Sequence, residues 1–380
     1  MNQNKKHILN ASIDLNLFSR YRNVIFGLAA ISIMLFHYSY DVWHYDAIGR
    51  IDASSSVIYQ AALVYYALIR SVGVEVFLFL SGMGLYYSFS KNHDLKRFYY
   101  KRMSRVLIPY LLCGGGFWIV RDLLMRDETW LDVVKDLTFY NFFARGEHYI
   151  WFVILIVMLY MIYPPVHYLL NDTDRRNVNF LILMALSIGL PMLYSWLDHD
   201  MFVQTNIATM RVPVFILGCY MGQPIREHRR IPVAPLVPFI AATIVLRWAT
   251  GWHQYSPVSA RMTAFIQSVG LLLLLVMAFR AAGKFLTPAV TGRVRRFLEI
   301  AGKYSLELYL THVCLRNFVK QTSVETYEPI VYLLIMAGAF LLSVVLSRAT
   351  DEILELNKEG IYQWRLRAMR RAAARVRQAA

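Results

Sequence analysis

The sequence predicts an all-α, polytopic membrane protein with about ten transmembrane helices and both termini in the cytoplasm. Three observations carry this prediction. The 380-residue chain is 57% hydrophobic and 14% aromatic, with a mean hydropathy of +0.40, whereas soluble proteins are about 45–50% apolar. Several apolar runs are long enough to cross a hydrocarbon core of about 30 Å. Lys and Arg residues gather at the ends of these runs, mainly on one side.

The apolar runs follow one another along almost the whole chain. We expect spans at about 23–42, 66–89, 105–123, 149–169, 178–196, 206–222, 232–249, 262–281, 300–319 and 329–348. The stretches 52–65 and 130–144 are predicted to lie on the membrane surface. We find no repeat at a solenoid period and no low-complexity block.

The Lys and Arg residues predict the orientation, because cytoplasmic loops carry an excess of them. With the N-terminus inside, every inside loop is basic. The inside groups are Lys5, Lys6, Arg20 and Arg22; Lys91, Lys96, Arg97, Lys101, Arg102 and Arg105; Arg175 and Arg176; Arg226, Arg229 and Arg230; Lys284, Arg293, Arg295 and Arg296; and the tail. The outside segments carry mainly Arg50, Arg121, Arg126, Lys135 and Arg145.

This orientation divides the chain into three parts. Residues 1–22 form a cytoplasmic segment, 23–348 a ten-helix membrane domain, and 349–380 a basic cytoplasmic tail. The tail places arginines among alanines in a helix-prone run, and we expect it on the anionic inner leaflet. Topology explains its charge better than a regulatory role does.

Several protein classes are disfavoured. A net charge of +15 suits nucleic acid, but the charges lie at the ends of apolar runs, so we expect no nucleic-acid partner. Cys113, Cys219 and Cys314 lie inside apolar segments and form neither a disulfide framework nor a metal motif. The polar N-terminus lacks a cleavable signal pattern, so the first helix is expected to direct insertion.

His37 is the chief ionisable interruption of the first apolar run, RYRNVIFGLAAISIMLFHYSYDV. A histidine at membrane depth is costly, so it usually faces a protein interior or a wet cavity. Helix rise places His37 roughly 7–8 Å below the outer surface, with Glu75 of the second span at a similar depth. Taken alone, a buried histidine bonded to a neighbouring helix explains His37 equally well.

Other polar side chains are expected at the same level. His148 and Trp151 open the fourth span at its outer face, and His312 lies in the outer half of the ninth. Ionisable groups at one depth on different helices predict a cavity. A carboxylate near an imidazole raises its basicity, which suits general-base catalysis on a hydroxyl. A transporter's proton relay would use the same residue types.

A basic cluster follows the second span in KNHDLKRFYYKRMSRVLIPY. It could set topology, or it could hold phosphates through bidentate arginine contacts. Ser81 and the run from Gly82 to Gly84 are expected to let a neighbouring helix approach closely. The sequence has no Walker loop, no dinucleotide-binding GxGxxG after a strand and no HExxH, so it offers no support for those chemistries.

Six stretches in this order resemble the acyltransferase-3 family of membrane acyltransferases: GLAAISIMLFHY, VGVEVFLFLSG, FYYKRMSRVLIPY, HYIWFV, RVPVFILGCYMG and SLELYLTH. The resemblance implies about ten spans and a cytoplasmic acyl-CoA donor, usually acetyl-CoA. It also implies transfer to a hydroxyl of a surface glycan or another acceptor. The family commonly has an Arg where this chain has Phe26. Arg22, one turn earlier on the same face, is the expected substitute. The family often has Asp where Glu75 stands.

The sequence is therefore interpreted as a bacterial inner-membrane O-acyltransferase that moves an acyl group, expected to be acetyl, to a glycan hydroxyl. His37 would act as base or carry the acyl group, and Glu75 would orient it. Acyl-CoA phosphates are assigned to Arg22, Arg102 and Arg105. The acceptor pocket is assigned to His148, Trp151, Arg211 and His312.

Several points stay open at this stage. No bound cofactor or metal is expected, and acetyl-CoA serves as the donor substrate. No extra-cytoplasmic hydrolase-like domain is expected after the tenth span. The alternatives are a glycan or lipid transporter or flippase, which would show broken helices in two related halves, and an assembly factor without catalysis. The acceptor, the acyl chain length and the oligomeric state, a homo-oligomer included, cannot be read from the sequence.

Overall fold

The computed structural model describes residues 12–69, 72–232 and 288–379, with a few single positions between 234 and 270. The first half contains β1 Ser12–Asp14, α2 Leu17–Arg20, α3 Arg22–Ala47, η1 Ala53–Ser55, α4 Val57–Ile69, α5 Val72–Phe89, α6 Leu95–Trp118 and the π-helix η2 Ile119–Met125. Then follow α7 Trp130–Leu137, α8 Tyr140–Arg145, α9 Trp151–Leu170, α10 Arg176–Leu197, α11 His199–Thr209, α12 Val212–Arg226, β2 Arg230–Pro232, α15 Pro288–Lys303, α16 Ser305–Val319 and α17 Pro329–Ala379.

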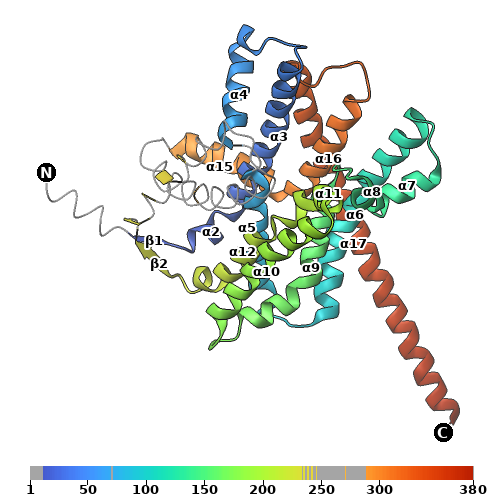
Figure 1. Ribbon diagram of the computed structural model, residues 1–380. Helices are drawn as coiled ribbons and strands as arrows, with labels where there is room; N and C mark the ends of the chain where they lie inside the picture. The colour runs from blue at the N-terminus through green and yellow to red at the C-terminus, as the bar shows by residue number, and fades with distance from the viewer. Residues whose placement is uncertain are drawn as a thin grey trace.

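The described residues are almost entirely helical (Figure 1). Strands β1 and β2 form one short antiparallel pair, with Ile13 opposite Ile231. Within the part of the chain that the structure describes, six helical segments are long and apolar enough to cross a membrane: Arg22–Ala47, Leu95–Met125, Trp151–Leu170, Arg176–Leu197, His199–Arg226 and Pro329–Asn357. The prediction of an all-α, multi-span membrane protein is confirmed at this level. The predicted spans 232–249 and 262–281 lie outside the described residues.

Three predicted spans are not single helices with the predicted bounds. Residues 66–69 belong to α4, and α5 begins at Val72, so the second span is shorter than predicted. The predicted span 206–222 contains the junction of α11 and α12, and 300–319 contains the junction of α15 and α16. Hydropathy misses these breaks because it averages over a window. A change of helix direction affects only the backbone hydrogen bonds at the turn.

Helix α3, which carries His37, crosses α15 at unusually short range through two glycines. A Cβ atom at Gly27 would collide with the backbone carbonyl of Leu298, and a Cβ at Gly302 would collide with that of Asn23. Small residues permit such backbone contacts between membrane helices. This crossing sets the height and rotation of α3.

Helix α5 meets α12 in the same manner. A Cβ at Gly82 would lie against the carbonyl of Phe215, and one at Gly218 against the carbonyl of Phe79. The packing role expected for Ser81 and Gly82 is therefore confirmed for Gly82. The crossing brings Glu75 on α5 to the start of α12.

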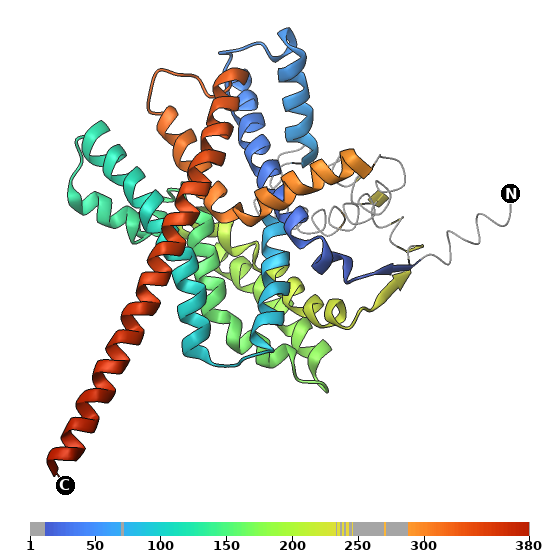
Figure 2. The same cartoon turned by 180° about the vertical axis from the view of Figure 1, so that it is seen from behind.

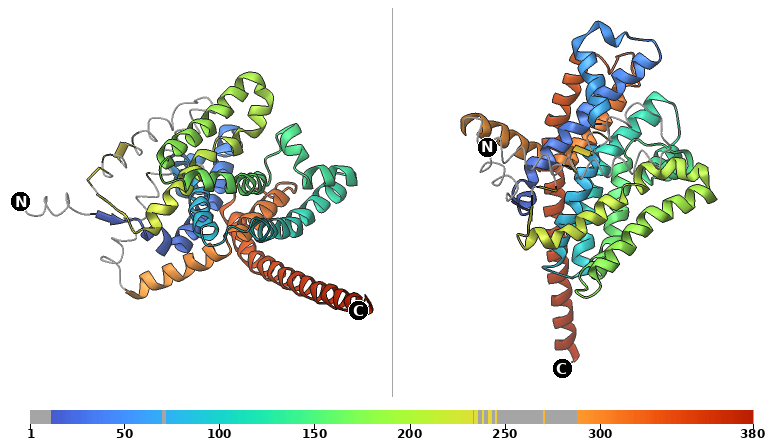
Figure 3. Two further views of the ribbon diagram at one scale, coloured as in Figure 1. Left: turned by 90° about the horizontal axis from the view of Figure 1, so that it is seen from below. Right: turned by 60° about the vertical axis from the view of Figure 1, so that its left-hand side comes forward.

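Helix α17 packs along α16 and α6 and then continues away from the helical body (Figure 2). The views in Figure 3 show its C-terminal part projecting alone. The predicted tail beginning at 349 is thus a continuation of the last span as one helix from Pro329 to Ala379. A polar contact joins it to the body where Arg105 on α6 pairs with Asp351.

Candidate active site

The centre of the site is a pair of histidines that face each other between α3 and α16. His37 Nδ1 lies 3.0 Å from His312 Nε2. The two rings are nearly parallel, with an interplanar angle of 11°. His312 is fully buried, whereas His37 is only partly covered. The sequence analysis placed both residues at one level, and the structure brings them into contact.

Tyr332 on α17 contacts both helices that carry this pair. Its hydroxyl oxygen lies 2.6 Å from the backbone oxygen of Met34 and 3.2 Å from His312 Nε2. The shorter contact assigns the hydroxyl proton to Met34, one helical turn before His37. Among the described residues, Nδ1 of His312 has no hydrogen-bond partner. His312 therefore supports His37 and is not itself part of the cavity wall.

A charged layer lies one turn further along the same two helices. Asp41 follows His37 by four residues, and Arg316 follows His312 by four, so both pairs share one helix face. Arg316 Nε donates to Asp41 Oδ2 at 2.8 Å, and Lys320 Nζ donates to Oδ1 at 2.6 Å. The hydroxyl of Thr326 donates to the same carboxylate at 2.8 Å.

Sequence reasoning missed this layer and Tyr332. The available signal was a charged residue four positions after each histidine. Asp41 follows His37 and Arg316 follows His312, and these two side chains carry opposite charges. The spacing alone does not show that the two helices are neighbours. The layer matters for the site because Arg316 also borders the cavity that His37 faces.

That cavity has a volume of about 250 Å³ and is called here the His37 cavity. Its lining consists of His37, His148, Tyr149, Trp151, Tyr309, Val313, Arg316 and Asn317. Three of the predicted site residues, His37, His148 and Trp151, thus meet at one cavity. Nε2 of His148 also lies 2.5 Å from the backbone oxygen of Gln204.

Glu75 lies beside this group but contacts a different partner. Its Oε1 accepts a hydrogen bond of 2.8 Å from Arg211 Nε, and both side chains are buried. The guanidinium of Arg211 lies over the ring of Trp151, 4.7 Å from the ring centroid. The hydrogen bonds described for Glu75 and His37 thus join them to Arg211 and His312, not to each other.

A larger cavity, about 630 Å³, lies at the other end of α3 and is called here the basic cavity. Its lining consists of Ser19, Arg22, Met83, Gly84, Tyr87, Ser88, Lys91, Asn92, Asp94, Arg97, Phe98, Lys101 and Arg102. Arg102 donates to the hydroxyl of Ser88 at 2.6 Å. Arg105 is absent from this lining and pairs with Asp351 instead. Of the three predicted phosphate ligands, Arg22 and Arg102 therefore share one cavity.

A third cavity, about 340 Å³, lies between the other two and is called here the middle cavity. Its lining consists of Arg22, Asn23, Phe26, Ile33, Phe77, Ser81, Val106, Phe152, Ile156, Tyr160, Gly302, Lys303, Ser305, Leu306 and Tyr309. Arg22 lines both this cavity and the basic cavity. Its guanidinium lies 4.9 Å from the ring centroid of Phe26. Arg22, the expected substitute for the family arginine, thus lies directly against Phe26, which stands at the position of that arginine.

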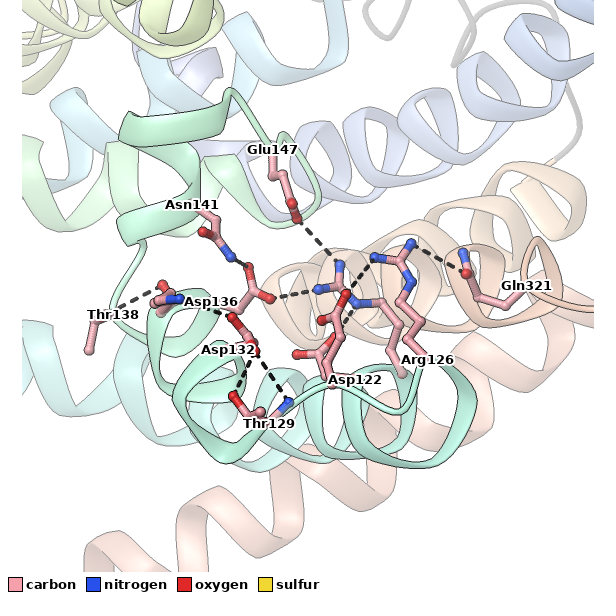
Figure 4. Close-up of polar contacts among 12 residues, drawn as sticks. Asp122, Arg126, Thr129, Asp132, Asp136, Thr138, Asn141, Glu147 and Gln321 are labelled. Atoms are coloured by element: carbon pink, nitrogen blue, oxygen red, sulfur yellow. Dashed lines mark hydrogen bonds and ion pairs between the residues drawn. The ribbon is translucent and has the colours of Figure 1, made fainter.

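The wall beside the His37 cavity is anchored by a buried guanidinium in the π-helix η2. Arg121 contacts Asp122 and donates to Asp136 at 2.6 Å, while Glu147 lies 3.4 Å away. Figure 4 labels these three acidic residues. Asn141 donates to Asp136 at 2.8 Å. Burial raises the pKa of the Asp136 carboxyl. The network ties η2, α7 and α8 to the loop that follows α8.

Two aromatic rings complete this anchor. The Arg121 guanidinium lies 4.3 Å from the ring centroid of Trp118 and 5.0 Å from that of Tyr149. Tyr149 and its neighbour His148 both line the His37 cavity. Sequence analysis counted Arg121 only as an outside charge, whereas the structure makes it the support of the cavity rim.

The acyltransferase-3 family model, described as an acyltransferase domain, matches residues 23–348. The chain therefore belongs to the acyltransferase-3 family, as the six stretches predicted, and it is a membrane acyltransferase. No curated protein and no solved structure matches the chain.

Proposed function

We propose that the protein transfers an acyl group, acetyl in the first instance, from cytoplasmic acyl-CoA to a glycan hydroxyl on the far side of a bacterial inner membrane. The observation that carries this proposal is a series of three cavities along α3. The basic cavity meets the middle cavity at Arg22, and the middle cavity meets the His37 cavity at Tyr309. A donor with an anionic head and a long, thin arm fits this series.

The donor head is assigned to the basic cavity. Lys91, Arg97, Lys101, Arg102 and Arg22 line it with a single carboxylate among them. Arginine offers paired donors that match phosphate oxygens. The pantetheine arm would pass Arg22 into the apolar middle cavity and bring the thioester towards Tyr309. The orientation proposed from the basic loops puts the basic cavity on the cytoplasmic side, where acyl-CoA is made.

His37 is assigned as the base. Its Nδ1 is held by His312, so Nε2 is the ring nitrogen left for the cavity. For Nε2 to act as base, Nδ1 carries the ring proton and donates to His312. The acceptor oxygen attacks the thioester carbonyl, its proton passes to His37, and the C–S bond breaks. The departing CoA sulfur then takes a proton, which leaves an ester and a free thiol.

The acceptor is assigned to the His37 cavity. Trp151 and Tyr149 offer aromatic faces of the kind that pack against sugar rings, and Asn317 offers a hydrogen bond to a hydroxyl. Arg211 supports Trp151 from behind through its cation–π contact. This makes Arg211 a support of the acceptor pocket. Arg211 is itself held by its ion pair with Glu75.

The proposal is tested in the cell and with purified protein. A deletion strain should lose acetyl ester from its surface glycan, measured by mass, and the parent gene should restore it. Purified protein in lipid nanodiscs should release CoA thiol from acetyl-CoA when glycan from the deletion strain is supplied. Loss of glycan export with unchanged acetylation would favour a transporter. No chemical change in either assay would contradict acyl transfer.

A further inference from the structure

Tyr309 on α16 occupies the junction between the middle cavity and the His37 cavity. Of the described residues, it alone lines both. Its ring packs edge-on against Phe152, with centroids 5.3 Å apart, so its position is well defined. A thioester that travels from Arg22 to His37 along this series of cavities must pass the Tyr309 side chain.

The hydroxyl group of Tyr309 has an unused proton. The residue is 7% exposed, and its oxygen is buried without a hydrogen-bond acceptor among the described residues. The backbone N–H of Phe152 approaches the oxygen, but it can only donate. A buried hydroxyl without an acceptor costs about 1–3 kcal/mol. Because Tyr309 also lies where two cavities meet, a ligand in those cavities could accept the proton that the protein leaves unpaired.

We propose that Tyr309 is a further catalytic residue, which donates a hydrogen bond to the carbonyl oxygen of the donor thioester. This inference rests on the proposed acyl transfer. When the acceptor oxygen forms its bond to the carbonyl carbon, negative charge develops on the carbonyl oxygen. The Tyr309 O–H stabilises that charge and keeps its own proton throughout. As the carbonyl reforms and the C–S bond breaks, the hydrogen bond weakens again.

The place of Tyr309 at the junction of the two cavities suits a donor to the transition state. His37 lines the same cavity and takes the acceptor proton, so base and oxyanion donor border one space. The two residues come from different helices, α3 and α16, which are joined by the contact between His37 and His312. A donor fixed before the reaction needs no reorganisation as charge develops.

The test is Tyr309→Phe, which removes one oxygen and keeps the ring. We expect kcat to fall about 100-fold, with KM for acetyl-CoA nearly unchanged, because the bond acts mainly in the transition state. The matched control is Tyr38→Phe. Tyr38 also has a buried hydroxyl without a described partner but lines none of the three cavities. Its rate should equal that of the parent.

Folding is measured beside the rate, by thermal melting in fluorescence-detected size exclusion. Tyr309→Phe should melt at or above the parent temperature, since the hydroxyl has no acceptor to lose. An active parent together with an equally active Tyr309→Phe overturns the role of Tyr309 and leaves acyl transfer standing. A rate loss that follows a lower melting temperature also overturns it. A parent that releases no thiol from acetyl-CoA overturns both proposals.

Discussion

Two polar pairs, one lining the His37 cavity and one beside it, are built differently. Glu75 and Arg211 form an ion pair in which both side chains are buried, with the ring of Trp151 against the guanidinium. His37 and His312 contact each other through ring nitrogens, and the His37 ring lines the cavity. The first pair balances its charges within the protein, although Oε2 of Glu75 has no hydrogen-bond partner among the described residues. The second leaves a nitrogen accessible to a substrate.

This difference separates support from chemistry. A buried carboxylate opposite a guanidinium holds two helices together, because either group alone would be an uncompensated charge. A histidine at a cavity edge can exchange a proton with a bound molecule. The charge of an ionisable residue at membrane depth therefore does not by itself make that residue catalytic. Access to a cavity decides which of the two roles it takes.

Breaking the ion pair of Glu75 and Arg211 should have the largest effect, on the stability of the fold. Arg211→Met leaves the Glu75 carboxylate buried without its cation, and we expect the free energy of unfolding to fall by about 3–5 kcal/mol. The double variant Glu75→Leu, Arg211→Met removes both charges and should recover most of the loss. Thermal melting of purified protein checks both. If Glu75→Gln melts like the parent but loses turnover, Glu75 acts in the reaction and not only in the fold.

Removal of the His37 ring, which lines the cavity, should have the next largest effect. His37→Ala removes the proposed base, and we expect turnover to fall about 100-fold or more, with less effect on folding. His44→Ala, on the exposed surface of the same helix, is the matched control. Acyl transfer is measured by mass of the modified glycan against the amount of folded protein. A folded His37→Ala with parental activity would refute the base.

The donor site offers a comparison of two neighbouring arginines. Arg102 lines the basic cavity, whereas Arg105 pairs with Asp351 outside it. Arg102→Ala should weaken acetyl-CoA binding about tenfold, the effect of one charge-assisted contact. Arg105→Ala should change it less than about twofold, since the ion pair is exposed. Calorimetry on purified protein measures both. Equal losses would return Arg105 to the donor site.

The smallest effect on turnover is expected for a change at Tyr332, which contacts His312. Tyr332→Phe removes the hydroxyl that holds Met34 and lies 3.2 Å from His312 Nε2. Loss of one neutral hydrogen bond corresponds to about 1 kcal/mol, so turnover should fall about fivefold through a less well-held His37. Tyr65→Phe, which loses a hydroxyl contact to Ser32 elsewhere on α3, is the control. Equal rates in parent and Tyr332→Phe would show that His312 alone positions His37.

The sequence by itself determined the class of protein and predicted a common depth for its key residues. Spanning runs are dictated by the thickness of the bilayer, and depth follows from helix rise, so His37, His148 and His312 could be placed at one level. Both quantities depend on distance along a single helix. The order of six stretches determined the family, because it requires only local similarity.

The tertiary structure decided which of these residues meet. His37 and His312 are separated by 275 positions, and Glu75 and Arg211 by 136. Depth does not say how a helix is rotated about its axis or which helix lies beside it. Those two quantities are set by close crossings such as that of Gly27 with α15, where absent side chains let backbones touch. For that reason Glu75 was expected beside His37 and is instead bound to Arg211.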